Sequence, residues 1–286
     1  MKTNAIVRIV LYTIAILALS GILLAALGVR EFSVHFEMGE EREIMLAQEV
    51  DPSQIRSIEI DWAAGNIQIQ PSETANVIQI SESEVTEKDK MLCKISGSTL
   101  HIQFCKDSIK LHGFGTNTLS KDLVITVPAD WLCSSLDIDA GAADVTIRDM
   151  TIQNLDFDGA SGRCDLEDCS VTNIEMDAAS GNVTFSGSLE TLDFDGASAD
   201  CKLVLTNCPR QISMDGASGN LDITLPSNCG FTAETGGLSF DFTTDFQTTT
   251  RNGAHIHGDG SCRIEIEALS GQVNIRDGGY RCSCGH

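Results

Sequence analysis

The sequence LDFDGASGRCDL occupies residues 155–166, and close copies of it lie on both sides along the chain. These copies are LDIDAGAADVTI at 136–147, IEMDAASGNVTF at 174–185, LDFDGASADCKL at 192–203 and ISMDGASGNLDI at 212–223. The acidic residue at the fourth position recurs at steps of 19, 19, 18 and 20 residues, as Asp139, Asp158, Asp177, Asp195 and Asp215. Self-similarity at such a period is typical of a solenoid.

The polarity pattern inside each copy indicates two short strands joined by a corner. Leu155 and Phe157 are apolar while their neighbours are acidic, and the same alternation resumes at Cys164 and Leu166. A unit of about 19 residues cannot bury its apolar face alone, but stacked units can. We therefore predict an all-β fold, a single-stranded right-handed parallel β-helix whose turns of chain, called rungs here, follow one another at about 4.8 Å.

The small residues between the two strands predict the corner of each rung. Glycine permits a sharp bend with positive φ, which we expect at Gly162, Gly181 and Gly219. The corner serines are Ser161, Ser180, Ser198 and Ser218. We interpret these serines as caps for corner backbone groups, because no nucleophile motif and no partnering histidine accompanies them.

Degenerate copies extend the repeat at both ends. They read IEIDWAAGNIQI at 58–69, FTAETGGLSFDF from 231 and IEIEALSGQVNI at 264–275, which predicts a domain over residues 51–286 with rungs in chain order. A less regular segment near its start contains a hairpin at 91–105, which we expect to cap the coil. An excursion at 241–260 carries His255 and His257, either a metal site or solvent-facing loop histidines.

The first thirty residues have the composition of a membrane anchor. Residues 9–29 are uncharged, lie between Arg8 and Arg30, and would span about 31 Å as a helix, the thickness of the hydrocarbon core of a bilayer. A cleaved signal peptide is the alternative, although its apolar region is usually shorter. We predict an N-terminal transmembrane signal-anchor at 1–30 that contacts membrane lipid through 9–29. A linker would follow at 31–50, with the C-terminal domain extracytoplasmic and the protein single-pass in the cell membrane.

Three segments resemble the bacterial putative-adhesin family, a group of domains of unknown function. They are LVITVPADWLCSSLDIDAGAADVTI at 123–147, ITLPSNCGFTAETGG at 223–237 and GDGSCRIEIEALSGQVNI at 258–275. The similarity extends over about residues 50–280. The resemblance implies a β-helix at the cell envelope, often behind a membrane segment, and it implies no catalytic residues.

The acidic residues at the fourth position should form a column on one face of the coil. Asp137, Asp156, Glu175 and Asp193, at the second position, would form a parallel column beside it. Unit charges 4.8 Å apart repel by about 0.9 kcal/mol in water and about 3.5 kcal/mol at an effective dielectric constant of 20. Hydrogen bonds from corner N–H groups to each carboxylate would relieve this repulsion. The alternative is a divalent cation such as Ca²⁺, bound by Asp139, Asp158, Asp177, Asp195 and Asp215.

The chain contains 11 cysteines, an odd number that cannot all pair within one chain. Cys164 and Cys201 occupy the same inward position two rungs apart, too far for a disulfide, and indicate buried thiols. Cys93 and Cys105 flank the predicted hairpin symmetrically about Thr99, which makes them a candidate disulfide. Soft-metal ligands in the last residues, Cys282, Cys284 and His286, suggest either a zinc or copper site or an unstructured tail.

Composition narrows the function classes. A net charge of −22 and an aromatic content of 5% argue against nucleic-acid binding, which needs a basic surface and stacking platforms. We favour a noncatalytic, membrane-anchored envelope protein that acts in adhesion or in sensing envelope state, with an envelope protein or surface component as partner. The alternative is a carbohydrate-active β-helix enzyme, but the central repeats lack the long loops that build a substrate groove.

Overall fold

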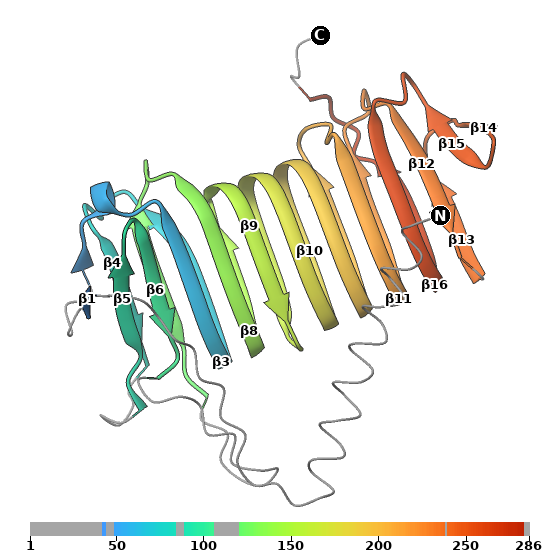
Figure 1. The fold of residues 1–286 in the computed structure, drawn as a ribbon. Helices are drawn as coiled ribbons and strands as arrows, with labels where there is room; N and C mark the ends of the chain where they lie inside the picture. The colour runs from blue at the N-terminus through green and yellow to red at the C-terminus, as the bar shows by residue number, and fades with distance from the viewer. Residues whose placement is uncertain (1–41, 44–48, 84–88, 106–119, 238, 283–286) are drawn as a thin grey trace, which may run out of the picture.

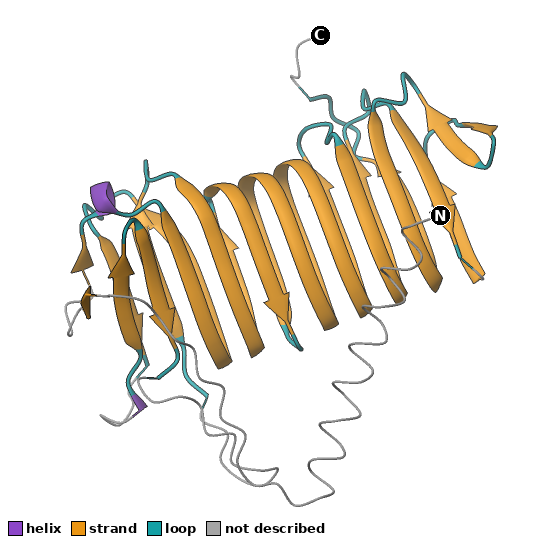
Figure 2. Cartoon of the chain, in the orientation of Figure 1, coloured by secondary structure: helices purple, strands orange, loops and turns teal. Residues whose placement is uncertain are grey.

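In a computed structural model of the chain, the structure describes residues 42–43, 49–83, 89–105, 120–237 and 239–282. The described chain is almost entirely β-structure, and its strands belong to one 16-stranded sheet (Figure 2). The sheet is largely parallel, with antiparallel pairs at both ends, and it winds into a row of successive rungs (Figure 1). The all-β, repeat-built fold is thus confirmed, while the right-handed sense of the coil stays a prediction.

The strands are numbered in chain order, and a short 3-10 helix, η1, spans Pro52–Gln54. They are β1 Arg42–Glu43, β2 Glu49–Val50, β3 Ser57–Ser72, β4 Ile78–Glu82, β5 Leu92–Ser96, β6 Thr99–Gln103, β7 Leu123–Pro128, β8 Cys133–Arg148, β9 Thr151–Gly159, β10 Arg163–Leu205, β11 Gln211–Leu225, β12 Phe231–Gly236, β13 Ser239–Thr244, β14 Thr249–Arg251, β15 Ala254–His257 and β16 Cys262–Asp277.

The central rungs stack in register, with equivalent repeat positions directly opposite one another. Leu155 of β9 pairs with Leu136 of β8 and with Ile174 of β10, all in parallel. Side-chain hydrogen bonds repeat the same step, as from Asn173 Nδ2 to Asn154 Oδ1 at 2.9 Å and from Ser188 to Ser170 at 2.8 Å. These contacts join residues 18 or 19 apart, which is the period of the sequence repeat.

The core lies inside the coil and is built from the alternating apolar positions. Phe157, Leu166 and Ile174 are each at most 5% exposed, and their equivalents in the other rungs are buried as well. Ile152 and Val171, from the connection between consecutive repeats, are also buried and supply a third set of inward side chains. Each rung therefore buries its apolar side chains against the rungs on either side of it, which a single repeat could not do.

The corners are tight because backbone meets backbone there. Gly162 has φ +133° and Gly181 has φ +145°, as the sequence predicts, while Gly219 is not among the described glycines with positive φ. A Cβ on Gly181 would lie 2.2 Å from the carbonyl oxygen of Gly162 in the preceding rung. The corner also bonds to the preceding rung, as from Ser161 N to Gly141 O at 3.2 Å.

At the N-terminal end, the chain leaves the coil and returns to it. β3 pairs with β8 on one side and with β6 and β7 on the other. The outermost rung at this end is therefore formed by β6 and β7, and β3 lies between that rung and β8. The hairpin of β5 and β6 lies at this end, where the sequence places it. β1 pairs with β5 and β2 with β4, so parts of the segment expected to be a linker are strands of the sheet.

At the C-terminal end, the order of rungs differs from the expected chain order. β16, the last repeat, pairs with β11 on one side and with β12 and β13 on the other (Figure 1). The repeat that begins at Phe231 is therefore the outermost one, and residues 264–275 are inserted beneath it. β14 and β15 form a hairpin beside β12 in the excursion. The strand order at this end depends on which apolar faces pack together in space, and the period of the sequence repeat does not determine that order.

The predicted anchor at residues 9–29 lies outside the described residues. Among the described residues, no helix is long and apolar enough to cross a bilayer.

Candidate functional site

The most distinctive surface of the molecule is a pair of adjacent carboxylate columns, which we call the acidic face. Parallel register places Asp158 opposite both Asp139 and Asp177, and Asp195 opposite Asp215. The columns extend beyond the five predicted residues at both ends. The acidic face consists of Asp61, Asp139, Asp158, Asp177, Asp195, Asp215 and Glu267 in one column and Glu59, Asp137, Asp156, Glu175, Asp193 and Glu265 in the other.

The strand pleat is what aims these side chains outward. Asp156 and Asp158 alternate with the buried Leu155 and Phe157, so a register fixed by the core also fixes the carboxylates on the opposite side. The carboxylates are exposed or half-buried, and none is buried. Only Ser213 interrupts the second-position column, between Asp193 and Glu265. The prediction that the fourth-position acids share one face is confirmed.

Stacking raises the pKa of many of these acids. Partial burial, followed by repulsion from Asp156 and Asp139, raises the pKa of Asp137 to about 6. Partial burial and the neighbouring Asp215 likewise raise the pKa of Asp195 to about 6. Burial and then like charge also raise the pKa values of Asp61, Asp139, Asp158, Asp177 and Asp215. Repulsion from Asp156, and then burial, raises the pKa of Glu175. Because the cause recurs in every rung, it singles out no catalytic pair.

The expected hydrogen bonds from corner N–H groups to the column are not formed in the described part of the chain. Those N–H groups are used between rungs, as from Ala160 N to Ala140 O at 3.2 Å. Asp139 and Asp158 instead remain close to each other as like charges, and partial burial followed by repulsion from neighbouring carboxylates raises the pKa of both carboxyl groups. Acids that follow the corner accept hydrogen bonds from backbone N–H groups instead. The Asp144 carboxylate, for example, accepts from Arg163 N at 2.9 Å.

Basic side chains contact the acidic face near its two ends. At the N-terminal end, His101 Nδ1 lies 3.0 Å from a carboxylate oxygen of Glu59. At the C-terminal end, the Arg263 guanidinium pairs with Glu265. Among the described residues, no group of three or more His, Cys, Asp or Glu side chains is positioned to hold a metal ion. Ca²⁺ binding by the column therefore stays a prediction, and it would require side-chain rotation toward a shared ion.

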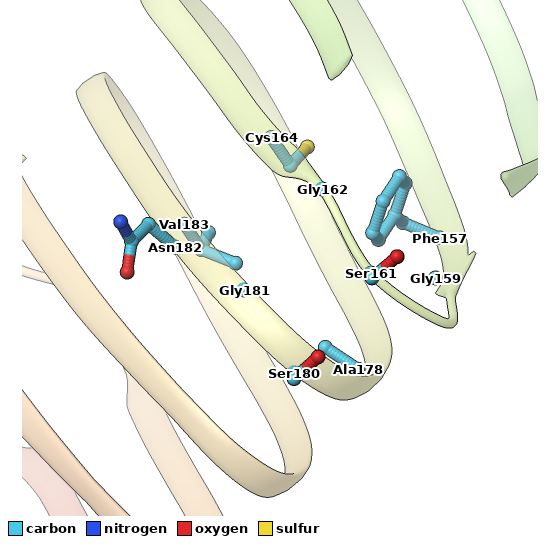
Figure 3. A pocket seen from close by; sticks show the side chains of 10 residues that line it. All are labelled: Phe157, Gly159, Ser161, Gly162, Cys164, Ala178, Ser180, Gly181, Asn182 and Val183. Carbon is cyan, nitrogen blue, oxygen red and sulfur yellow. The ribbon is translucent and has the colours of Figure 1, made fainter. Parts of the chain in front are cut away.

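The described surface offers little enclosed space for a small substrate. One cavity lies at the corners of two adjacent rungs, between Phe157, Ser161, Gly181 and Val183, and holds about 10 Å³, room for one water molecule at most (Figure 3). A second, more open hollow of about 200 Å³ lies near the C-terminal end, where Thr243 and Asp245 face Arg276. Neither is lined by residues of the acidic face.

Two other candidate sites from the sequence have a different structure from the one expected. The hairpin turns at Gly97 and Ser98, so Cys93 lies opposite Ile102 and not opposite Cys105. That disulfide prediction is wrong because the turn is centred before Thr99. His255 stacks on Phe242, with ring centroids 4.2 Å apart, and His257 packs against Phe231 and Phe246, so both are aromatic packing residues.

The buried thiols are as expected, and the C-terminal ligand set is only partly described. Cys164 and Cys201 are each 2% exposed, as inward-facing side chains. Cys284 and His286 lie outside the described residues. Sequence reasoning missed a convergence of Cys208, Cys229, Cys262 and Cys282, which is described below. These four cysteines are not spaced at the repeat period in the sequence. Cys262 lies beside Cys229 only because β16 is inserted next to β12.

Several solved structures resemble the chain. A "putative cell adhesion protein" from Clostridium sporogenes is 10% identical, with a TM-score of 0.31 over 83% of this chain and 100% of that one. A "putative adhesin" from Bacteroides fragilis is 12% identical, with a TM-score of 0.37 over 82% and 96%. A "putative lipid binding protein" from Parabacteroides distasonis is 16% identical, with a TM-score of 0.39 over 82% and 96%. A comparison with curated proteins found no match.

One protein family covers most of the described chain. The family described as Toastrack DUF4097, whose function is unknown, matches residues 55–188 and again residues 132–276. The two matches overlap at 132–188, as expected when one repeating unit can be aligned in more than one register. Together they include the central rungs, the corners from β3 to β16 and the acidic face. The chain belongs to the Toastrack DUF4097 family.

Proposed function

We propose that this chain is a noncatalytic, membrane-anchored module of the cell envelope, exported behind residues 9–29, whose acidic face binds a positively charged surface component. Adhesion and the sensing of envelope state are both forms of such binding. The observation that carries the proposal is the register that stacks Asp139, Asp158 and Asp177 in one outward column. An interaction with a cationic partner would relieve the like-charge repulsion that the fold itself creates.

Two features of the described surface support binding over catalysis. The cavity at the rung corners holds about 10 Å³, and the acidic face is a repeated array without an enclosed cleft. The raised pKa of Asp195 is a property that general acids share, yet Asp137 has the same shift for the same reason. A carbohydrate-active enzyme would need one acid and one base set apart from the others.

The test is cross-linking in intact cells that carry the full chain. A photo-reactive residue at Thr172, which is exposed in the segment leading to the acidic face, would capture the partner. The triple variant Asp158→Asn, Asp177→Asn and Asp195→Asn should reduce the captured yield at least about tenfold, and added salt should weaken capture by the natural chain.

The matched control removes the same charge elsewhere. Glu73→Gln, Asp130→Asn and Glu190→Gln neutralise three exposed carboxylates outside the acidic face and should leave the yield unchanged. An equal loss in both triple variants would show that only net charge matters, and an unchanged yield in the first would remove the acidic face from the binding site. Polysaccharide hydrolysis that disappears in Asp195→Asn would favour the enzymatic alternative.

A further inference from the structure

Four cysteines from separate parts of the chain converge at the C-terminal end of the coil. Cys208 lies between β10 and β11, Cys229 precedes β12, Cys262 begins β16 and Cys282 follows β16. Cys229 and Cys262 are fully buried, at 0% exposure, and Cys208 and Cys282 are partly buried. The insertion of β16 beside β12 creates this convergence, since it pairs Cys262 with Phe231, two residues after Cys229.

The sulfur atoms form a chain of contacts. The Sγ atoms of Cys208 and Cys282 are 3.6 Å apart. Cys262 N donates to Gly230 O at 3.0 Å, which places Cys262 beside Cys229. The Cys229 thiol interacts with the thiols of both Cys208 and Cys262. The contacts therefore run in the order Cys282, Cys208, Cys229, Cys262. Such a linear order allows only one pairing that uses all four sulfurs, namely Cys282 with Cys208 and Cys229 with Cys262.

Hydrogen bonds hold the C-terminal segment in place independently of the sulfur atoms. The Asn228 side chain accepts from Cys282 N at 3.0 Å and donates to Cys282 O at 3.5 Å. The Tyr280 hydroxyl donates to Leu205 O at 2.6 Å, and Ser227 N donates to Tyr280 O at 2.7 Å. The backbone around Cys282 is thus positioned by hydrogen bonds, and these bring its Sγ to within 3.6 Å of Cys208 Sγ.

We infer that Cys208–Cys282 and Cys229–Cys262 are two disulfide bonds that lock the C-terminal end of the coil. The first would close a loop around β11 to β16, and the second would close the excursion from β12 to β15. The second would hold the outermost rung against the inserted β16, and the first would hold the segment after β16 against the connection between β10 and β11. This inference depends on the proposed function in one respect, namely that export would place the domain in an oxidising compartment, where disulfides persist.

The oxidation balances with a disulfide compound as the oxidant, such as oxidised glutathione or a thiol–disulfide oxidoreductase. One cysteine sulfur attacks the oxidant and forms a mixed disulfide, and the second then displaces the oxidant's thiol. Each Sγ–Sγ bond formed releases two protons and two electrons from the chain, and the electrons reduce the oxidant's disulfide to two thiols. Burial and the neighbouring thiols raise the pKa of Cys208, so this attack should be slow near neutral pH.

The experiment maps the pairs in the purified full chain after equilibration with a mixture of reduced and oxidised glutathione. Free thiols are alkylated under denaturing conditions, and the chain is digested with trypsin without reduction. The expected result is peptide 203–210 joined to 282–286 and peptide 211–251 joined to 252–263, with Cys164 and Cys201 alkylated as internal controls. A parallel Cys284→Ala chain leaves one cysteine in the last peptide.

Single variants and reductant provide the second measurement. Cys208→Ala should abolish the 203–210 link and keep the 211–251 link. Reductant should lower the Tm of the natural chain by about 10 °C and that of Cys208→Ala with Cys282→Ala by less. A link between Cys208 and Cys229, complete alkylation of all four cysteines, one bound zinc ion per chain, or a Tm unaffected by reductant would overturn the inference. Because glutathione supplies the oxidant in vitro, failure of the proposed export or of partner binding would leave these results unchanged.

Discussion

At the scale of single residues, the corner glycines allow the rungs to stack closely. Gly181 combines φ +145° with a site where a Cβ would lie 2.2 Å from the Gly162 carbonyl oxygen. The atoms that would meet the new Cβ are backbone atoms of Gly162, and they could move away only if the two rungs separated. The small-residue corner is therefore required by close approach as well as by the turn itself.

We expect Gly181→Ala to destabilise the protein by at least about 2 kcal/mol, because the new side chain meets both an unfavourable φ and a backbone oxygen. Gly236→Ala is the matched control, since its Cβ would meet nothing nearer than Glu267 Cγ at 3.7 Å and its φ is not positive. Urea unfolding followed by circular dichroism would measure both. Equal losses in the two variants would contradict the close-approach explanation.

At the scale of elements, the N-terminal outer rung encloses a buried ion pair. Lys121 precedes β7, its side chain is 0% exposed, and its Nζ lies 2.5 Å from a carboxylate oxygen of Glu82 in β4. The same Nζ lies 4.9 Å from the ring centroid of Trp62 and 4.6 Å from that of Phe104. Lys121 therefore connects β3, β4 and the residues next to β6 and β7. The sequence repeat is least regular in this part of the chain.

Lys121→Met should cost about 3 kcal/mol of stability, because it leaves the Glu82 carboxylate, 10% exposed, without its cation. Adding Glu82→Gln should restore part of this loss, since the uncompensated charge is then gone. Chemical denaturation of the single and double variants would test the pair, with the exposed Lys202→Met as control. Equal stability of Lys121→Met and Lys202→Met would show that the pair contributes little.

At the scale of the whole molecule, the acidic face should make stability depend on pH. A carboxyl whose pKa is raised in the folded state contributes stability that is present below its unfolded pKa and is lost as pH rises through its folded value. For Asp137 and Asp195 that window runs from 3.8 to about 6. Glu167, whose pKa is lowered by its hydrogen bond with Arg148, acts in the opposite sense at lower pH. We therefore expect stability to be greatest near pH 4, at the start of this window, and to fall as pH rises to about 6.

The Tm should fall by roughly 5 °C between pH 4 and pH 8 at low ionic strength, a figure already reduced for the solvent screening of partly exposed groups. Thermal unfolding by circular dichroism across this range would measure it. The Asp158→Asn, Asp177→Asn and Asp195→Asn triple variant should flatten the profile, whereas the Glu73→Gln, Asp130→Asn and Glu190→Gln control should not. A Tm that rises steadily to pH 8 would contradict the assignment of repulsion to the acidic face.

The divalent-cation hypothesis for Asp139, Asp158, Asp177, Asp195 and Asp215 has a separate test. Millimolar Ca²⁺ should raise the Tm of the natural chain above its value in chelator at matched ionic strength, and the triple variant should lose most of this shift. Scanning calorimetry would measure the difference. Superimposable curves for the natural chain in both solutions would show that ordinary screening, and not bound Ca²⁺, relieves the column.

The central rungs could be predicted from sequence because one local rule repeats there. Alternation places Leu155 and Phe157 inside, and the constant period then places Asp158 over Asp139 without any knowledge of distant contacts. The same logic failed for Gly219, Cys93 and Cys105, where a local detail of the backbone decides. It also failed for the expected carboxylate caps, because the corner N–H groups bond to the neighbouring rung.

The amino-acid sequence alone determined that this chain stacks short strands over a shared apolar interior and displays acids in rows, since both follow from periodicity. Only the tertiary structure decided how the ends are built. β16 lies beneath β12 and β13, and this placement brings Cys262 to Cys229 and Cys282 to Cys208. A period specifies that rungs stack, but the order in which equivalent apolar faces pair depends on contacts between residues far apart in the chain.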